Sequence, residues 1–185
     1  AAYIIPWYSW FGDNKLQANA LYTKGFTVYS LFLMLSTAGL PAAISKQISH
    51  YNSIGEYNSS FRLFKGSIVL AAVLGIIIGG LMWSLSPILA GGDYRMVSIF
   101  RSLAPAVMII PIMSVGRGFF QGFKDMKPSA ISQFAEQLFR IIYMLVTTYI
   151  IMKIVKGSYV SGTIQSTFAA FIGAVAGTGV LIFFF

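Results

Sequence analysis

Apolar residues fill long stretches of the chain that contain no charged side chain. Residues 25–45 form one such run of 21 residues, and residues 66–92 form another of 27. A helix needs about 20 predominantly apolar residues to cross a bilayer, because every backbone polar group must be satisfied within the segment. Both runs therefore predict transmembrane helices.

Two further stretches are as long but carry charge, and a third closes the chain. The run 96–116 contains Arg101, and the run 128–152 contains Glu136 and Arg140. No charged residue follows Lys156. The pattern predicts an all-α polytopic membrane bundle, a single transmembrane domain of five complete helices plus the end of a first. The expected spans are approximately 1–11 (partial), 19–45, 66–89, 96–120, 128–152 and 162–185.

Composition supports a membrane protein, and it argues against a soluble domain and against a nucleic-acid partner. Of the 185 residues, 57% are hydrophobic and only 10% are charged, whereas a soluble domain has about 25% charged residues. The net charge of +8 favours anionic membrane lipids over nucleic acid as a partner, because the basic residues lie between the apolar runs and not in one patch. The short loops with the larger Lys and Arg content, 46–65 and 117–127, are expected on the cytoplasmic side.

The sequence lacks the usual motifs of catalysis. It has no cysteine and one histidine, so no thiolate site or histidine metal cluster is expected. It also has no Gly-rich phosphate loop and no Ser-His-Asp set. We therefore expect no metal, no cofactor and no enzymatic activity.

Polar residues inside two of the spans are aligned, since positions three and four apart share a helix face. One polar stripe in the span 128–152 consists of Ser129, Gln133, Glu136, Arg140, Tyr143 and Thr147. Another in the span 19–45 consists of Asn19, Thr23, Thr27, Ser30, Thr37 and Pro41. Each of these helices is expected to turn one face to a wet environment.

The charged residues within spans have two interpretations. Glu136 and Arg140 are four residues apart and could pair, which suits either a structural salt bridge or a functional site in a cavity. Arg101 is expected to extend toward the interface. A group near a helix end, expected to meet lipid headgroups, consists of Arg117, Gln121 and Lys124.

Glycines four residues apart occur at 75/79, 118/122 and 173/177. Small residues at this spacing allow helices to approach closely. Tight packing is the favoured interpretation, and a sliding interface is the alternative.

Several segments are similar to those of one transporter family. The stretch 116–133, GRGFFQGFKDMKPSAISQ, continues to Glu136-Gln137 and Arg140. Together with segments 39–46, 20–25 and 4–8, it resembles the polysaccharide-biosynthesis and stage V sporulation protein B branch of the multidrug/oligosaccharidyl-lipid/polysaccharide exporter superfamily. That branch includes the MurJ-type lipid II flippases.

The resemblance implies a two-lobed transporter of the bacterial cytoplasmic membrane, of which this chain is the amino-terminal lobe. It implies that the substrate is an undecaprenyl-pyrophosphate-linked sugar precursor, either lipid II or a polysaccharide repeat unit. It also implies that the precursor crosses by alternating access through a cationic cavity, which the missing carboxy-terminal lobe closes. The candidate pyrophosphate contacts are Lys24, Arg101 and Arg140, since Arg and Lys bind phosphate oxygens. The candidate cavity lining, or site for a coupling Na⁺ or H⁺, consists of Asn19, Thr23, Gln133, Glu136 and Tyr143.

The chain departs from one pattern of the family. Gram-negative members resemble each other in a basic residue midway along the second helix, where this chain has the apolar residues 31–34. The pyrophosphate contacts of those members therefore do not carry over to this chain residue by residue. Two alternatives also stay open, a cation-coupled multidrug antiporter of the same superfamily and a non-transporting membrane scaffold for cell-wall enzymes.

Overall fold

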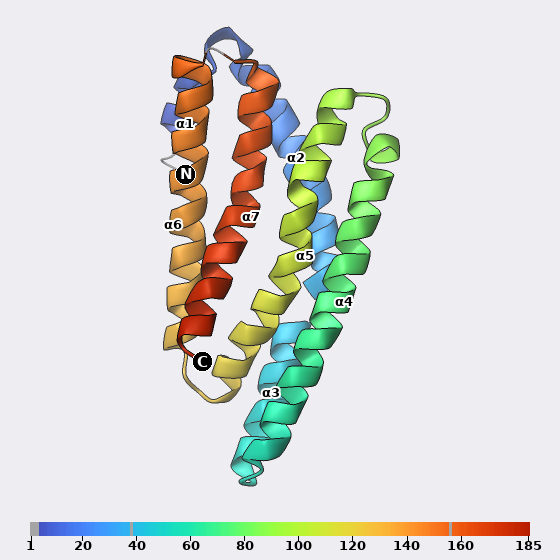
Figure 1. The fold of residues 1–185 in the computed structure, drawn as a ribbon, viewed down its shortest axis with the longest axis vertical. Helices are drawn as coiled ribbons and strands as arrows, with labels where there is room; N and C mark the ends of the chain where they lie inside the picture. The colour runs from blue at the N-terminus through green and yellow to red at the C-terminus, as the bar shows by residue number, and fades with distance from the viewer. Residues whose placement is uncertain (1–3, 38, 156) are drawn as a thin grey trace.

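The computed structural model describes residues 4–37, 39–155 and 157–185, and all regular structure in them is helical (Figure 1). The elements are α1 (Ile4–Trp10), a 3₁₀ turn (Gly12–Asn14), α2 (Lys15–Thr37), α3 (Leu40–Ser53), α4 (Tyr57–Leu89), α5 (Tyr94–Gly122), α6 (Lys127–Tyr149), a π-helical turn (Ile150–Ile154) and α7 (Tyr159–Phe183). The expected all-α fold is confirmed. Of the expected partial span 1–11, residues 1–3 lie outside the described residues.

Five segments of the described chain are long and apolar enough to cross a membrane: Gly12–Ser53, Tyr57–Leu89, Tyr94–Gly122, Lys127–Ile154 and Tyr159–Phe183. Several begin before the apolar run that predicts them. α4 has 33 residues and is therefore about 50 Å long, against an apolar bilayer core of about 30 Å. The helix is therefore longer than the apolar core, and its first turns can lie in water. These turns carry the exposed Arg62 and Lys65.

The expected continuous span 19–45 is divided in the structure. α2 ends at Thr37 and α3 begins at Leu40. Gly39 has a φ of +71°, a left-handed conformation that glycine adopts without steric penalty. Pro41 follows in the first turn of α3, where its missing N–H is tolerated. The apolar pattern alone did not indicate this break, because no charged residue interrupts the run 25–45 on either side of it.

α5 is the central helix of the bundle. In Figure 1 it lies between α4 on one side and the α6–α7 pair on the other, and it also packs against α2 and α3. Its fully buried side chains include Ile99, Leu103 and Val107. α6 packs chiefly on α7, and the hairpin of α3 and α4 extends beyond the other helices at one end (Figure 1).

Hydrogen bonds between side chains fix the short α1 against the α6–α7 pair. Trp7 Nε1 donates to Ser166 Oγ at 2.9 Å, and Thr148 Oγ1 shares a second hydrogen bond of 2.9 Å with the same Ser166 Oγ. All three residues are buried. Each buried polar group here therefore has a partner, as a stable membrane-embedded contact requires.

The three glycine pairs lie in three different helix contacts. Gly79 of α4 faces Met108 and Ala104 of α5, and Gly118 of α5 faces the backbone of Pro41 in α3. On α7, a Cβ at Gly173 would lie 2.7 Å from the carbonyl oxygen of Glu136. The favoured interpretation, tight packing, agrees with these close approaches.

Gly173→Ala is expected to lower the free energy of unfolding by about 1 to 3 kcal/mol, because the added methyl group would force α6 and α7 apart. Gly179→Ala is the matched control on the same helix, since nothing lies within 4 Å of a Cβ there. The thermal unfolding midpoints of the two variants of the full-length protein in detergent measure the difference. Equal midpoints would contradict the close α6–α7 packing.

Candidate functional site

Glu136 pairs with a residue of a neighbouring helix. Its Oε2 accepts a hydrogen bond of 2.8 Å from Nη2 of Arg117 on α5, and the side chains are only 13% (Arg117) and 14% (Glu136) exposed. The i,i+4 spacing pointed to Arg140 as the partner of Glu136, and this expectation was wrong. The reason is that α6 packs with this face toward α5 and α7, which brings the Arg117 guanidinium to the carboxylate.

Serine hydroxyls complete the polar cluster around Arg117. Nε and Nη2 of Arg117 donate to Ser132 Oγ at 3.2 and 3.0 Å, and Ser132 Oγ donates to the Gly177 carbonyl oxygen of α7 at 2.9 Å. Ser129 Oγ donates to the Arg117 carbonyl oxygen at 3.1 Å. We call Arg117, Ser129, Ser132 and Glu136 the Arg117 cluster; it ties α5, α6 and α7 together.

The Arg117 cluster changes the interpretation of the three residues expected to meet lipid headgroups, Arg117, Gln121 and Lys124. Arg117 is directed into the bundle, where Glu136 neutralises its charge, and so it does not face lipid headgroups. Gln121 is partly buried and Lys124 is exposed. Contact of Lys124 with lipid headgroups stays a prediction.

Arg140 is left with a neutral partner. Its Nη2 donates to Gln137 Oε1 at 2.9 Å, and in the described part of the chain no carboxylate lies within 4.0 Å of its guanidinium. Gln137 and Gln133 on the same side of α6 are exposed, and Arg140 is partly exposed. Arg140 is thus a cation of a transmembrane helix with donors available for an anion.

The other end of the α6 stripe is directed toward α7. Tyr143 Oη donates to Gln165 Oε1 at 2.8 Å, and Thr147 Oγ1 donates to the Tyr143 carbonyl oxygen at 2.7 Å. These groups already have partners. Of this stripe, Gln133 is exposed and Arg140 is partly exposed.

The polar stripe of α2 lies on an open face. Thr23, Thr27 and Ser30 are exposed, and Asn19 is partly buried. Thr27 Oγ1 and Ser30 Oγ donate to carbonyl oxygens of their own helix at 2.9 and 2.7 Å. Hydroxyls bonded in this way are satisfied without a neighbouring helix, so this face can border water or a ligand.

Lys24 and Arg101 have surroundings unlike those of Arg140. Lys24 is exposed and lines a cavity of about 390 Å³ with Thr23 and Thr27 of α2 and Asp93 before α5. Arg101 Nε donates to Ser86 Oγ of α4 at 3.3 Å. The three basic candidates share no partner and no cavity among the described residues, and their common role at a pyrophosphate stays a prediction.

Arg101 also contacts an aromatic ring of the membrane-facing helix α4. Its guanidinium carbon lies 5.6 Å from the centre of the Trp83 ring, and Trp83 is 46% exposed. Stacking of Arg on Trp beside lipid is typical of a residue that reaches toward the interface. The structure therefore favours this role for Arg101.

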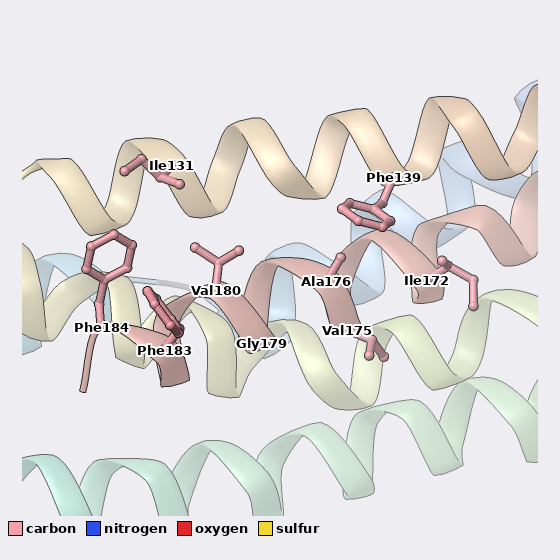
Figure 2. A pocket seen from close by; sticks show the side chains of 9 residues that line it. All are labelled: Ile131, Phe139, Ile172, Val175, Ala176, Gly179, Val180, Phe183 and Phe184. Carbon is pink, nitrogen blue, oxygen red and sulfur yellow. The ribbon is translucent and has the colours of Figure 1, made fainter.

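An apolar groove of about 680 Å³ lies between α6 and α7. Figure 2 shows Ile131 and Phe139 of α6 on one side of it and residues 172–184 at the end of the chain on the other. No member of the polar stripe lines the groove. It therefore suits hydrocarbon, and the polar candidates lie elsewhere.

Metal chemistry has no evident place in the described residues. No group of three or more His, Asp or Glu side chains there is arranged to hold a metal ion. What the described polar faces offer is an arginine without a counterion and rows of hydroxyl and amide groups. This arrangement can bind a polar or anionic group within the membrane.

Comparison with known proteins identifies relatives. The family model described as polysaccharide biosynthesis protein matches residues 17–185. The lipid II flippase MurJ of Bacillus subtilis (strain 168) is 38% identical over 190 residues, which cover 97% of this chain and 34% of that protein. Stage V sporulation protein B of the same organism is 33% identical over 135 residues, 71% of this chain and 26% of that protein.

A third relative, an uncharacterised membrane protein named YabM of the same organism, is 28% identical over 180 residues, 96% of this chain and 32% of that protein. No solved structure matches the chain significantly. The chain thus spans about a third or less of the length of these relatives.

Proposed function

We propose, since the chain belongs to the polysaccharide biosynthesis protein family, that it forms the amino-terminal lobe of a flippase for undecaprenyl-pyrophosphate-linked sugar precursors. The chain is an all-α, multi-pass protein of the bacterial cytoplasmic membrane. The observation that carries the proposal is the 38% identity with a lipid II flippase over 97% of the chain.

In this proposal the polar faces of α2 and α6 form one wall of the transport cavity. The second wall comes from the rest of the longer parent protein, and rocking of the two lobes exposes the cavity to each side in turn. The exposed Gln133 and the hydroxyls of α2 bind the sugar headgroup. The polyprenyl tail stays in the bilayer while the headgroup crosses. In this proposal the precursor is moved intact, and no covalent bond is made or broken.

Arg140 is the pyrophosphate contact in this proposal. A guanidinium presents parallel N–H donors that match two phosphate oxygens. Arg140 uses one nitrogen for Gln137 and has no carboxylate to displace. Arg101 and Lys24 are assigned weaker roles, because the former stacks on Trp83 and the latter lies in a separate cavity beside Asp93.

A multidrug antiporter is less well supported. Such a transporter needs a carboxylate free to exchange a cationic drug for Na⁺ or H⁺. The carboxylate within this stripe, Glu136, is bound to Arg117 at 2.8 Å. Na⁺ or H⁺ coupling of the flippase, if it exists, is therefore assigned to groups other than Glu136.

The full-length parent protein in a bacterium depleted of its own lipid II flippase tests the proposal. We expect restored growth and lipid II accessible at the outer face of the membrane. Parent protein that reaches the membrane without restoring either would exclude lipid II as the cargo, and capsule or teichoic acid precursors would then be tested. A non-transporting scaffold predicts no rescue, and it predicts that neutralising Glu136 and Arg140 together changes nothing but stability.

A further inference from the structure

A polar pocket lies at the end of the bundle where the α3–α4 hairpin meets the end of α5. Its volume is about 300 Å³, and it is separate from the polar faces of α2 and α6. Five of its lining side chains are Ser49, Asn52, Ser53, Tyr57 and Lys124. The hairpin and the α5–α6 loop lie at the same end of the molecule in Figure 1.

The lining side chains can donate hydrogen bonds, and one carries positive charge. Hydroxyls with a proton to donate come from Ser49 and Tyr57, an amide from Asn52 and an ammonium group from Lys124, with no carboxylate in the lining. The Ser53 hydroxyl already donates to the His50 carbonyl oxygen at 2.7 Å. An ammonium group together with hydroxyl and amide donors is the chemistry that binds an oxyanion.

Asn52 has a donor without an acceptor. Its Oδ1 accepts a hydrogen bond of 3.0 Å from Ser60 Oγ, which fixes the orientation of the amide. Its Nδ2 is shielded from solvent and has no hydrogen-bond partner. Buried donors in native proteins are rarely left without an acceptor, and an oxyanion in the pocket would supply one.

Lys124 occupies a backbone conformation that favours glycine. Its φ is +61°, and no other non-glycine residue of the described chain has a positive φ. Hydrogen bonds that close α5 hold it there, from Lys124 N to the Gln121 carbonyl oxygen at 3.0 Å and from Asp125 N to the Phe120 carbonyl oxygen at 3.1 Å. A lysine at this position carries a conformational penalty, and it places a cation on the pocket.

Neighbouring carboxylates of the described residues make no ion pair with Lys124. Asp125 Oδ1 accepts a hydrogen bond from Lys127 N at 3.1 Å, and Glu56 Oε2 accepts one from Ser59 Oγ at 2.8 Å. Neither residue lines the pocket, and neither carboxylate lies within 4.0 Å of the Lys124 ammonium group.

We infer that this pocket binds a phosphate-bearing anion, independently of the transported substrate. The ligand's phosphate oxygens accept hydrogen bonds from Lys124 Nζ, from the hydroxyl groups of Ser49 and Tyr57, and from Asn52 Nδ2. Two sources offer this chemistry, the headgroup of an anionic phospholipid and free phosphate in solution. A headgroup suits a pocket beside the loops that follow transmembrane helices.

The test measures the thermal unfolding midpoint of the purified full-length parent protein in neutral detergent. Short-chain phosphatidylglycerol and inorganic phosphate are titrated separately at constant ionic strength, against phosphatidylcholine of the same chain length. A ligand that binds the folded state raises the midpoint with its concentration. We expect phosphatidylglycerol, inorganic phosphate or both to do so, and the arm that responds identifies the source.

Two variants connect the effect to the pocket. Lys124→Gly removes the cation and relieves the positive φ, so the fold is retained. Asn52→Asp keeps the acceptor for Ser60 and replaces the unpaired donor by a carboxylate oxygen. Each variant is expected to weaken the apparent affinity for the anion at least about tenfold. Lys124→Gly removes a charge-assisted contact, and Asn52→Asp places a negative charge against the anion.

Lys65→Gln is the matched control, because it removes an exposed positive charge from the same end of the molecule but outside the pocket. It is expected to retain the affinity of the unchanged protein. The inference is overturned if neither anion raises the midpoint, or if Lys65→Gln weakens binding as much as Lys124→Gly.

Discussion

Glu136→Ala in the full-length protein is expected to lower the free energy of unfolding by about 3 kcal/mol. The variant leaves Arg117 with a charged guanidinium inside the bundle and no anion, and an uncompensated buried charge is strongly destabilising. Arg117 is 13% exposed, so water cannot replace the carboxylate fully. The unfolding transition of the purified protein in mixed micelles of increasing SDS content measures the loss.

A double variant distinguishes a mutually dependent pair from two independent residues. Arg117→Met combined with Glu136→Met removes both charges and fills similar volume, and it is expected to be closer in stability to the unchanged protein than either single change. Gln133→Ala on the exposed side of α6 is the control and is expected to alter stability by less than about 0.5 kcal/mol. Losses that simply add in the double variant would contradict the pairing.

The sequence predicted the helices better than it predicted their partners. Runs of apolar residues indicate membrane-spanning helices because the bilayer imposes one length on all of them. The position of a charged residue in such a run says only that it needs a partner or water. Glu136 has one basic residue four positions away in its own helix and another 19 positions away in α5, and only the packing of α5 against α6 selects the second.

Two other features depend on packing or backbone conformation in the same way. The chain turns at Gly39 within a run that no charged residue interrupts. The positive φ of Lys124 and its place on a polar pocket became visible only in the structure. The Asn52 donor gave no signal in the sequence, because a single Asn near a helix end is common.

The choice of Arg117 as the partner of Glu136 has a consequence for Arg140. If the i,i+4 pair had formed, the stripe on α6 would have been neutral, and an anionic substrate would have had to break a salt bridge. In the structure the neutral Gln137 is the hydrogen-bond partner of Arg140. On α6, Glu136 thereby has a structural role in the Arg117 cluster, and Arg140 stays available for the proposed binding role.

Arg140→Ala is therefore expected to abolish transport while the protein still folds. Loss of charge-assisted hydrogen bonds to the pyrophosphate removes about 1.5 to 3 kcal/mol each, which corresponds to roughly a 10- to 100-fold loss of affinity per contact. Growth and outer-face lipid II in the flippase-depleted bacterium are the measurements, with the amount of protein in the membrane determined for each strain. Arg140→Lys keeps the charge without the two-pronged geometry, and partial activity is expected.

Gln137→Ala is the control that distinguishes loss of the Arg140 cation from loss of the hydrogen bond between Arg140 and Gln137. It removes the neutral partner of Arg140 and leaves the cation, so the proposed phosphate contact survives and growth should be restored. If Arg140 served only to bind Gln137, the two alanine variants would behave alike. Full rescue by Arg140→Ala at normal protein level would remove Arg140 from the binding site, and the cavity of Lys24, Thr23 and Thr27 would become the next place to test for the pyrophosphate.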